Sequence, residues 1–235
     1  MADQQRGQHV VNAFLAARRA RRAVDRQGID YIQRIVSERE SMLRTLEKLP
    51  TTEWDHPTLC EGWQIRHVIG HLISGATRLA VRDLTRLVVR YRTDIDGGFD
   101  DDARRRGAHP PDTLLQEFRA IVHSRIMPPG LPRGLMWCDN VIHGLDVRVP
   151  LGEPDPGPPR RLAEVAECLS AMTWPSRTAC RADGLQFVAD DLDWTMGDGP
   201  TITGSIESIV LALAGRPAGI NRLTGEGVAI LVARP

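Results

Sequence analysis

The chain has 235 residues, of which 42% are hydrophobic, so it can bury the core of one large domain or two small ones. Its 30 basic and 30 acidic residues balance, which argues against nucleic acid as a partner. No apolar run reaches the ~18 residues of a membrane-spanning helix, and the four cysteines are widely spaced without a CxxC pair. These features predict a globular protein of the reducing cytoplasm, with neither a membrane nor a nucleic acid as partner.

An Arg-rich, acid-poor, helix-prone segment opens the chain. It is similar to an organelle presequence or a basic surface arm, but we expect residues 1–28 to be a solvated helical extension. Apolar residues then recur at three- and four-residue steps, which predicts one helix over about 29–49 and a second over about 64–90. The acidic, glycine-bearing stretch that follows is expected to form a loop over 94–111 that could cover a site.

Two more helices are predicted before the middle of the chain ends. Asp112 is a plausible N-cap for the third, and the fourth carries Leu135, Ile142 and Leu145. Four helices with one long connection predict a bundle over 29–152, and bundles build metal sites from side chains on facing helices.

The pattern changes after a Pro- and Gly-rich linker, GEPDPGPPR. A helix is predicted over about 159–173, and near-alternation of apolar and polar residues predicts strands in LQFVADDLDWTM and TITG. Ser205 is expected to cap a short helix that ends at Gly215, and GVAILV is predicted to be a final strand. The fold class is therefore α+β, with a small α+β domain over 153–235.

A carboxylate and two histidines are the most direct indication of chemistry. Asp139 and His143 are four residues apart, which places them within about 40° of each other on one helix face. With His71 from another helix they would form a His/His/carboxylate set with an open position, the arrangement typical of a catalytic zinc. Taken singly, each histidine is more typical of a packed core residue than of a ligand, and Asp139 is compatible with an exposed or ion-paired carboxylate.

Neighbouring residues leave alternatives open. His67 and His71 also share a helix face, so His67, His71 and His143 form a rival ligand set. Cys138 is turned about 100° away from Asp139 and is expected to be a packed thiol. Asp146 lies three residues beyond His143, where it could accept a hydrogen bond from the imidazole or lie on the surface.

At this point the chain resembles a known family. The resemblance begins with EWDHPTLCEGWQIRHVIGHL, which is similar to the signature of the mycothiol-dependent maleylpyruvate isomerase family. The later segments HGLDVRVPLG and ITGSIESIVLALAGR are similar to that family's other landmarks. The resemblance covers roughly 30–235. It implies a DinB-like metal-binding four-helix bundle followed by a sterol-carrier-protein-like C-terminal domain.

The resemblance also implies a site. Family members hold a divalent metal, usually zinc, at positions that match His71, Asp139 and His143, and they use mycothiol as the thiol cofactor. The family usually has glutamate where this chain has Asp139, so the shorter carboxylate must approach more closely or bind through water. The family's Thr and Asp near the start of the second helix are replaced here by Gln64 and His67.

Arg216 matches an arginine associated with function in the family, and the resemblance implies a catalytic role for it. The alternative is a structural role, in which the arginine satisfies the last carbonyls of a helix.

The expected function is therefore that of a metal- and mycothiol-dependent isomerase or thiol transferase that acts on a small electrophile. Two alternatives remain open at this level. One is a non-catalytic metal-binding or regulatory module of the same fold, and the other is a metal-dependent hydrolase in which the open position activates water.

Overall fold

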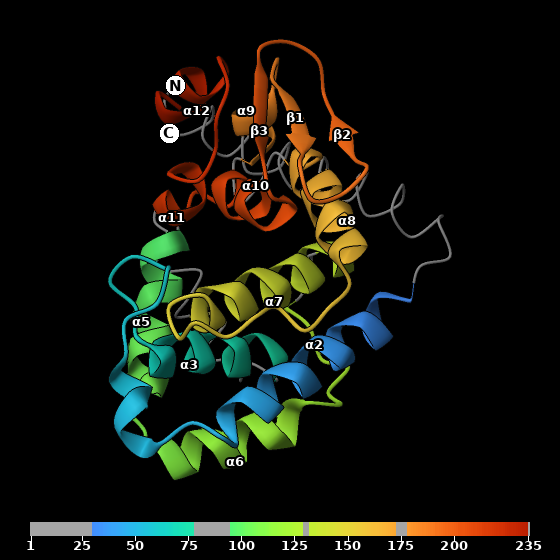
Figure 1. Ribbon diagram of the computed structural model, residues 1–235. Coiled ribbons are helices and arrows are strands. Elements are labelled where there is room, and N and C mark those ends of the chain that lie inside the picture. Colours follow the sequence, from blue (N-terminus) through green and yellow to red (C-terminus); the bar gives the residue numbers. More distant parts are fainter. Residues whose placement is uncertain (1–29, 78–94, 129–131, 173–177, 235) are drawn as a thin grey trace, which may run out of the picture. The chain divides into compact units, whose positions relative to one another are not determined.

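The computed structural model describes residues 30–77, 95–128, 132–172 and 178–234, which fall into two compact units (Figure 1). A helical unit extends over Asp30–Pro154, and a C-terminal unit begins at Asp155. The expected extension over 1–28 and the distal part of the expected 64–90 helix lie outside the described residues. Among the helices of the described residues, none is both long and apolar enough to cross a membrane.

The helical unit is built from amphipathic helices. These are α2 (Tyr31–Leu46), η2 (Thr51–Asp55), α3 (Ile65–Ala76), α5 (Ile95–Gly107), α6 (Pro111–Ile121) and α7 (Arg133–Arg148). The side chain of Asp30 starts α2 by accepting hydrogen bonds from the backbone N–H groups of Ile32 (3.1 Å) and Gln33 (3.2 Å). Helices α2, α3, α6 and α7 pack together as the sequence periodicity predicts.

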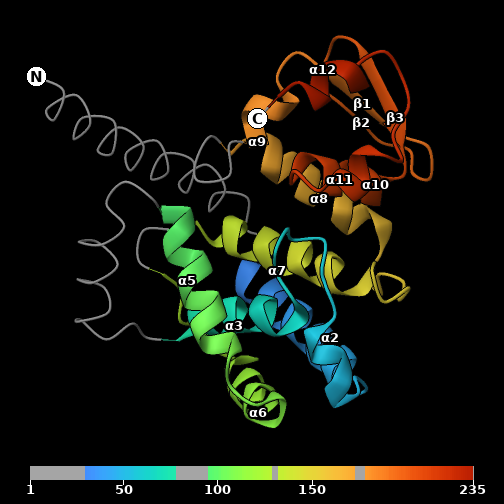
Figure 2. The same cartoon turned by 90° about the vertical axis from the view of Figure 1, so that its left-hand side faces the viewer.

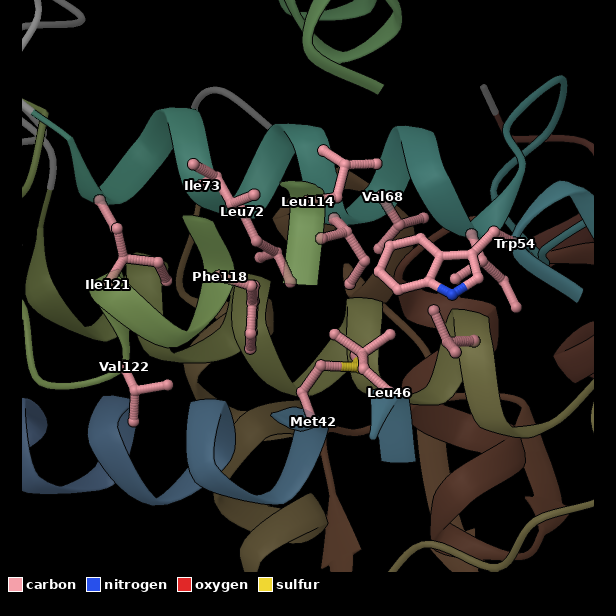
Figure 3. Close-up of a cluster of buried hydrophobic side chains, with 14 residues drawn as sticks. Met42, Leu46, Trp54, Val68, Leu72, Ile73, Leu114, Phe118, Ile121 and Val122 are labelled. Carbon is pink, nitrogen blue, oxygen red and sulfur yellow. The ribbon is translucent and has the colours of Figure 1, made fainter. Parts of the chain in front are cut away.

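A continuous apolar core joins these helices (Figure 3). Its members come from α2, η2, α3, α7 and α6 with its C-cap, and those of α2, α3 and α6 lie at the helical spacing seen in the sequence. They are Met42, Leu46, Trp54, Ile65, Val68, Ile69, Leu72, Ile73, Ala76, Leu114, Phe118, Ile121, Val122 and Val147. Because this core holds α3 in place from one side, the opposite side of α3 is left to meet α5.

The expected 94–111 loop is wrong, since Ile95–Gly107 is helical and packs along α3 (Figure 2). The two helices meet backbone to backbone. A Cβ on Gly70 would lie 2.7 Å from the carbonyl oxygen of Ala103 and 2.8 Å from the amide nitrogen of Gly107. The polar sequence of α5 gives little sign of a helix. Its close contact with α3 is possible because glycine has no side chain at the point of contact.

The start of α6 also differs from the prediction. The helix begins at Pro111 with Pro110 as the N-cap residue, and Asp112 lies in its first turn. Proline suits the first helical position because its missing N–H has no partner there, and the carboxylate still interacts favourably with the positive end of the helix.

The C-terminal unit packs helices beside a three-stranded sheet, which confirms the α+β class. Its elements are α8 (Pro159–Ser170), α9 (Thr178–Ala182), β1 (Gln186–Ala189), β2 (Thr195–Met196), β3 (Thr201–Gly204), α10 (Ile206–Leu213), α11 (Pro217–Ile220) and α12 (Val228–Val232). The strand order is β2-β1-β3, with β1 antiparallel to β2 and parallel to β3.

Helix α10 has both predicted ends. The Ser205 hydroxyl accepts the N–H of Ser208 at 3.2 Å, and Gly215 adopts a positive φ of 80° just after the helix. The N–H groups of Gly215 and Arg216 bond to the carbonyls of Ala212 (2.9 Å) and Leu211 (2.8 Å), which is the Schellman pattern.

The predicted final strand is wrong: GVAILV forms helix α12 instead. A short apolar run has no periodicity that separates a strand from a helix. Here β1 and β3 pair with each other, and the chain after Thr224 turns into a helix rather than adding a strand.

Candidate metal centre

Helix α7 presents three polar side chains on one face. Asp139, His143 and Asp146 are spaced four and three residues apart, so they lie one above the other. The His143 imidazole lies between the two carboxylates. Its Nε2 is 3.5 Å from Asp139 Oδ1, and its Nδ1 is 2.9 Å from Asp146 Oδ2.

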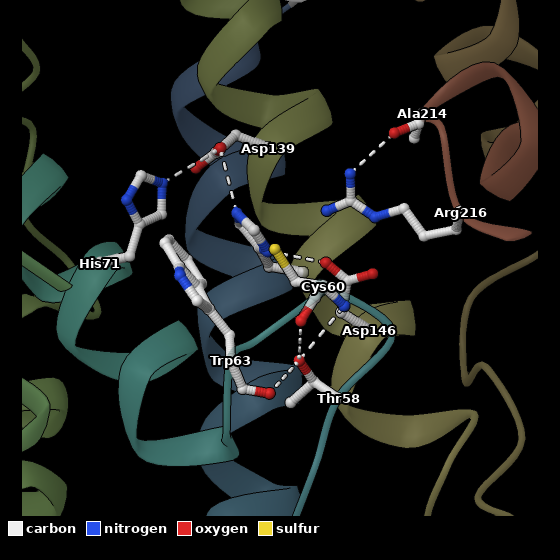
Figure 4. A network of polar contacts seen from close by, with 9 residues as sticks. Thr58, Cys60, Trp63, His71, Asp139, Asp146, Ala214 and Arg216 are labelled. Carbon is white, nitrogen blue, oxygen red and sulfur yellow. Dashed lines mark hydrogen bonds and ion pairs between the residues drawn. The ribbon is translucent and has the colours of Figure 1, made fainter. Parts of the chain in front are cut away.

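His71 approaches the same carboxylate from α3. Its Nε2 lies 3.4 Å from Asp139 Oδ1, as Figure 4 shows. One potential ligand atom from each of His71, Asp139 and His143 lies within 4.8 Å of the other two, and the described residues contain no other such group of His, Cys, Asp and Glu side chains. The structure thus brings the three residues together from helices that are far apart in the chain.

Two of the three separations between these atoms fit a small divalent cation. Ligand atoms about 2.0–2.1 Å from a tetrahedral zinc are separated from one another by roughly 3.3–3.4 Å. The two Nε2–Oδ1 separations, 3.4 and 3.5 Å, are close to that value. Asp139 therefore reaches both imidazoles despite being one methylene shorter than glutamate.

Asp146 orients the His143 imidazole. Its side chain is fully buried, and its Oδ2 is positioned to accept a hydrogen bond from His143 Nδ1. With the proton on Nδ1, the Nε2 lone pair is available on the side of Asp139 and His71. The carboxylate–histidine contact that sequence spacing allowed is thus present.

Aromatic rings surround the two imidazoles. The Trp63 indole stacks on His143, with centroids 5.9 Å apart and planes at 18°, and lies 5.3 Å from the His71 ring. Phe99 of α5 meets His71 edge-on at 5.8 Å. These apolar surfaces limit the directions from which water and small molecules can reach the polar atoms.

Sequence reasoning missed Trp63 and Asp100 as site neighbours. Trp63 Nε1 donates to Asp100 Oδ1 at 2.7 Å, and Arg104 Nε lies 2.9 Å from each oxygen of the same carboxylate. The hydrogen bonds from Arg104 and then Trp63 hold the pKa of Asp100 below its ordinary value. Trp63 is part of the family-like motif, whereas Asp100 lies in the stretch expected to be a loop.

The rival set that includes His67 does not form. His67 Nδ1 accepts the backbone N–H of Gln64 at 3.1 Å, so the ring caps the start of α3 instead of joining His71. A Cβ on Gly107 would lie 2.8 Å from His67 Cδ2, which places the ring against α5. Burial, followed by the charges of Arg104 and Arg66, lowers the pKa of His67.

This lowered pKa predicts acid sensitivity. The unfolded chain takes up a proton at His67 more readily than the native state, so stability should fall as pH drops below 6.5 toward the native pKa. The variant His67→Gln keeps an acceptor for the Gln64 N–H without titrating, and should lose less stability. Urea unfolding at about pH 7.5 and about pH 5 measures the difference.

His109→Gln is the matched control, because this half-exposed imidazole pairs only with Glu117 among its described contacts. If the free energy of unfolding falls equally in wild type and His67→Gln between the two pH values, His67 is not the source of the acid sensitivity.

Two buried residues, Cys138 of α7 and Arg39 of α2, are neighbours of the cluster in sequence or in charge. Cys138 is fully buried, as its turned-away position predicts. Arg39 of α2 is 1% exposed and donates through Nη1 to the carbonyls of Ile121 (3.2 Å) and Ser124 (2.9 Å). Burial lowers its pKa to about 10, while the charge of Asp139 acts in the opposite direction. Arg39 is thus a buried cation that attracts the Asp139 carboxylate at neutral pH.

Arg216 belongs to the C-terminal unit. It is the N-cap residue of α11, and its Nη1 donates to the carbonyl oxygen of Ala214 at 2.7 Å, as drawn in Figure 4. Nη1 therefore satisfies a carbonyl at the end of α10, as the structural interpretation of Arg216 predicts.

One family model matches a stretch within the helical unit. The model of the mycothiol maleylpyruvate isomerase N-terminal domain matches residues 35–126. The matched region includes His71 and Trp63 and ends before α7, which carries Asp139 and His143.

Two uncharacterized proteins of Mycobacterium tuberculosis, from different strains, are each 26% identical to this chain over 160 residues. The match takes in 58% of this chain and spans 62% of the length of these relatives.

Two crystal structures share the fold. They are the mycothiol-dependent maleylpyruvate isomerase and a mutant of it, with TM-scores of 0.55 and 0.56 at 17% sequence identity. The likeness covers 84% of this chain and 92% of each of those chains.

Proposed function

We propose that this chain, whose residues 35–126 match the model of the mycothiol maleylpyruvate isomerase N-terminal domain, is a metal- and thiol-dependent isomerase or thiol transferase. Its substrate would be a small electrophile, its metal zinc or a similar divalent ion, and its thiol mycothiol. A cytoplasmic setting is part of the proposal, because the chain has four widely spaced cysteines and no CxxC pair.

One observation carries the proposal: three ligand atoms from His71, Asp139 and His143 converge within 4.8 Å. One buried and one partly buried imidazole beside a carboxylate could hold a divalent ion with one position left open. A packed core would instead place apolar groups around lone histidines, and it would not need the Asp146 carboxylate behind His143.

The bound metal would supply one effect, which is to lower the pKa of a thiol so that thiolate is present at neutral pH. The residues supply the rest. His71, Asp139 and His143 would hold the ion, and Asp146 keeps the proton of His143 on Nδ1. Trp63 and Phe99 would restrict solvent around the reacting sulfur.

Arg216 is proposed to bind a carboxylate of the substrate or thiol cofactor. A guanidinium presents several N–H donors in a plane that matches a carboxylate. One of these donors, Nη1, bonds to the carbonyl oxygen of Ala214. Arg216→Lys keeps the positive charge but loses the planar set of N–H donors, so it should raise KM more than it lowers kcat.

The testing experiment combines metal analysis with turnover. Protein purified without added metal is expected to contain close to one equivalent of zinc or a similar ion. Incubation with mycothiol and a panel of cis-alkene and other electrophilic acids should give isomer or thiol adduct only when both metal and thiol are present. Wild type after chelation and metal restoration serves as the control.

Each other outcome selects an alternative. Metal without thiol-dependent turnover on any electrophile would favour the non-catalytic module. Thiol-independent hydrolysis of an ester or amide would favour the hydrolase. Substoichiometric metal that does not rise on adding zinc would overturn the metal centre itself.

A further inference from the structure

Trp63 contacts both imidazoles of the candidate centre although it lies on neither ligand-bearing helix. It sits in the segment just before α3, which begins at Ile65. Its indole is nearly parallel to the His143 ring, at 18°, and inclined by 53° to the His71 ring. Centroid separations of 5.9 and 5.3 Å are within the range of favourable aromatic contact. The indole therefore stacks on the His143 ring and meets the His71 ring at an inclined angle.

A closed ring of hydrogen bonds includes the Nε1–H group of this indole. Trp63 Nε1 donates to Asp100, Arg104 grips both oxygens of Asp100, and Arg104 Nη2 reaches back to the carbonyl oxygen of Gly62 at 3.0 Å. Gly62 precedes Trp63 and has a φ of 72°, a conformation that favours glycine. The indole is thus tied through α5 to its own backbone neighbour.

We propose that Trp63, held by Asp100 and Arg104, is a positioning residue that sets the planes of the His143 and His71 imidazoles for metal binding. This inference rests on the proposed metal centre and deepens it. An imidazole binds a metal only when its nitrogen lone pair, which lies in the ring plane, points at the ion. Asp146 determines which nitrogen of His143 faces the site, and the stacked indole limits how far the rings can tilt.

A tryptophan that merely fills the core would behave differently. Trp63 does pack against the apolar core, so losing its ring would cost stability in either case. The Asp100 side chain is 41% exposed, and its ion pair with Arg104 is a surface pair. Such pairs contribute little to folding, so removing the Asp100 carboxylate separates positioning from packing.

The variants are Asp100→Ala, Trp63→Phe and Trp63→Leu. Zinc affinity is measured by chelator competition, the visible spectrum of the Co²⁺-substituted protein reports ligand geometry, and the melting temperature of the metal-free protein reports packing. Asp100→Ala is expected to weaken zinc binding by about 10-fold and to shift the Co²⁺ bands, with the metal-free melting temperature nearly unchanged. Trp63→Leu is expected to weaken zinc binding by up to about 100-fold.

Asp102→Ala is the matched control, because Asp102 lies on the same helix and pairs with Arg105. It should leave zinc affinity and the Co²⁺ spectrum as in wild type. In the Trp63→Phe background, which lacks the N–H, adding Asp100→Ala should have little further effect on affinity.

Two results would overturn the proposal in distinguishable ways. Zinc affinities of Asp100→Ala and Trp63→Leu within about twofold of wild type, with an unchanged Co²⁺ spectrum, would refute positioning while leaving the metal centre intact. A wild-type protein that binds no zinc or Co²⁺ would refute the metal centre and the positioning role with it.

Discussion

The substitution His143→Ala is expected to weaken zinc binding by more than about 100-fold. Loss of a residue that only orients a metal ligand typically costs up to about 100-fold, and loss of a ligand should cost more. His143 offers one of the three ligand atoms, and its 7% exposure leaves little room for water to replace the imidazole. The substitution also leaves Asp146 buried without the imidazole. Metal content after purification and chelator competition measure the loss.

Asp146→Asn probes the same ring from behind. The amide oxygen can still accept from Nδ1 but carries no charge, so we expect a smaller loss of zinc affinity, about 10-fold. His109→Ala removes a half-exposed imidazole outside the cluster and is expected to bind zinc as wild type does. His143→Ala protein that retains zinc affinity within about tenfold of wild type would exclude His143 as a ligand.

Gly70→Ala is expected to lower the free energy of unfolding by about 1–3 kcal/mol, although alanine is the better helix former by up to about 1 kcal/mol. The added methyl would lie 2.7 and 2.8 Å from backbone atoms of α5, and backbone cannot move aside as a side-chain end can. The steric effect therefore exceeds the gain in helix propensity. Urea unfolding of metal-free protein measures it.

Gly75→Ala provides the comparison within the same helix. The nearest atom to its added methyl is Met136 Cε at 3.4 Å, which is the flexible end of a side chain. This variant should be as stable as wild type or slightly more stable. If Gly70→Ala proved equally stable, the close contact of α3 and α5 would be refuted.

Features set by local sequence were predictable. The caps of α10 at Ser205 and Gly215 depend on residues within a few positions, and the core helices follow from apolar spacing. The Asp139–His143 pair is local in the same sense, since four residues are about one helical turn. For these features, the chemistry of neighbouring residues is sufficient.

Features set by packing were mispredicted. Helix α5 has an acidic, glycine-bearing sequence with weak apolar periodicity, and it is stabilised by lying against α3 through Gly70 and Gly107. The apolar run in α12 was compatible with a strand, and what it becomes depends on how the strands before it pair. Both outcomes depend on partners that are distant in the chain.

The candidate centre divides in the same way. The sequence by itself determined that Asp139 and His143 share a helix face, with Asp146 in reach of the imidazole, because helical geometry follows from residue spacing. Only the tertiary structure decided that His71 joins them and His67 does not, because both histidines lie on one side of α3 and packing alone selects which one meets α7. It also decided that Asp100 accepts a hydrogen bond from Trp63, whose indole contacts both rings. Trp63 and Asp100 are 37 residues apart, so no local spacing encodes this bond.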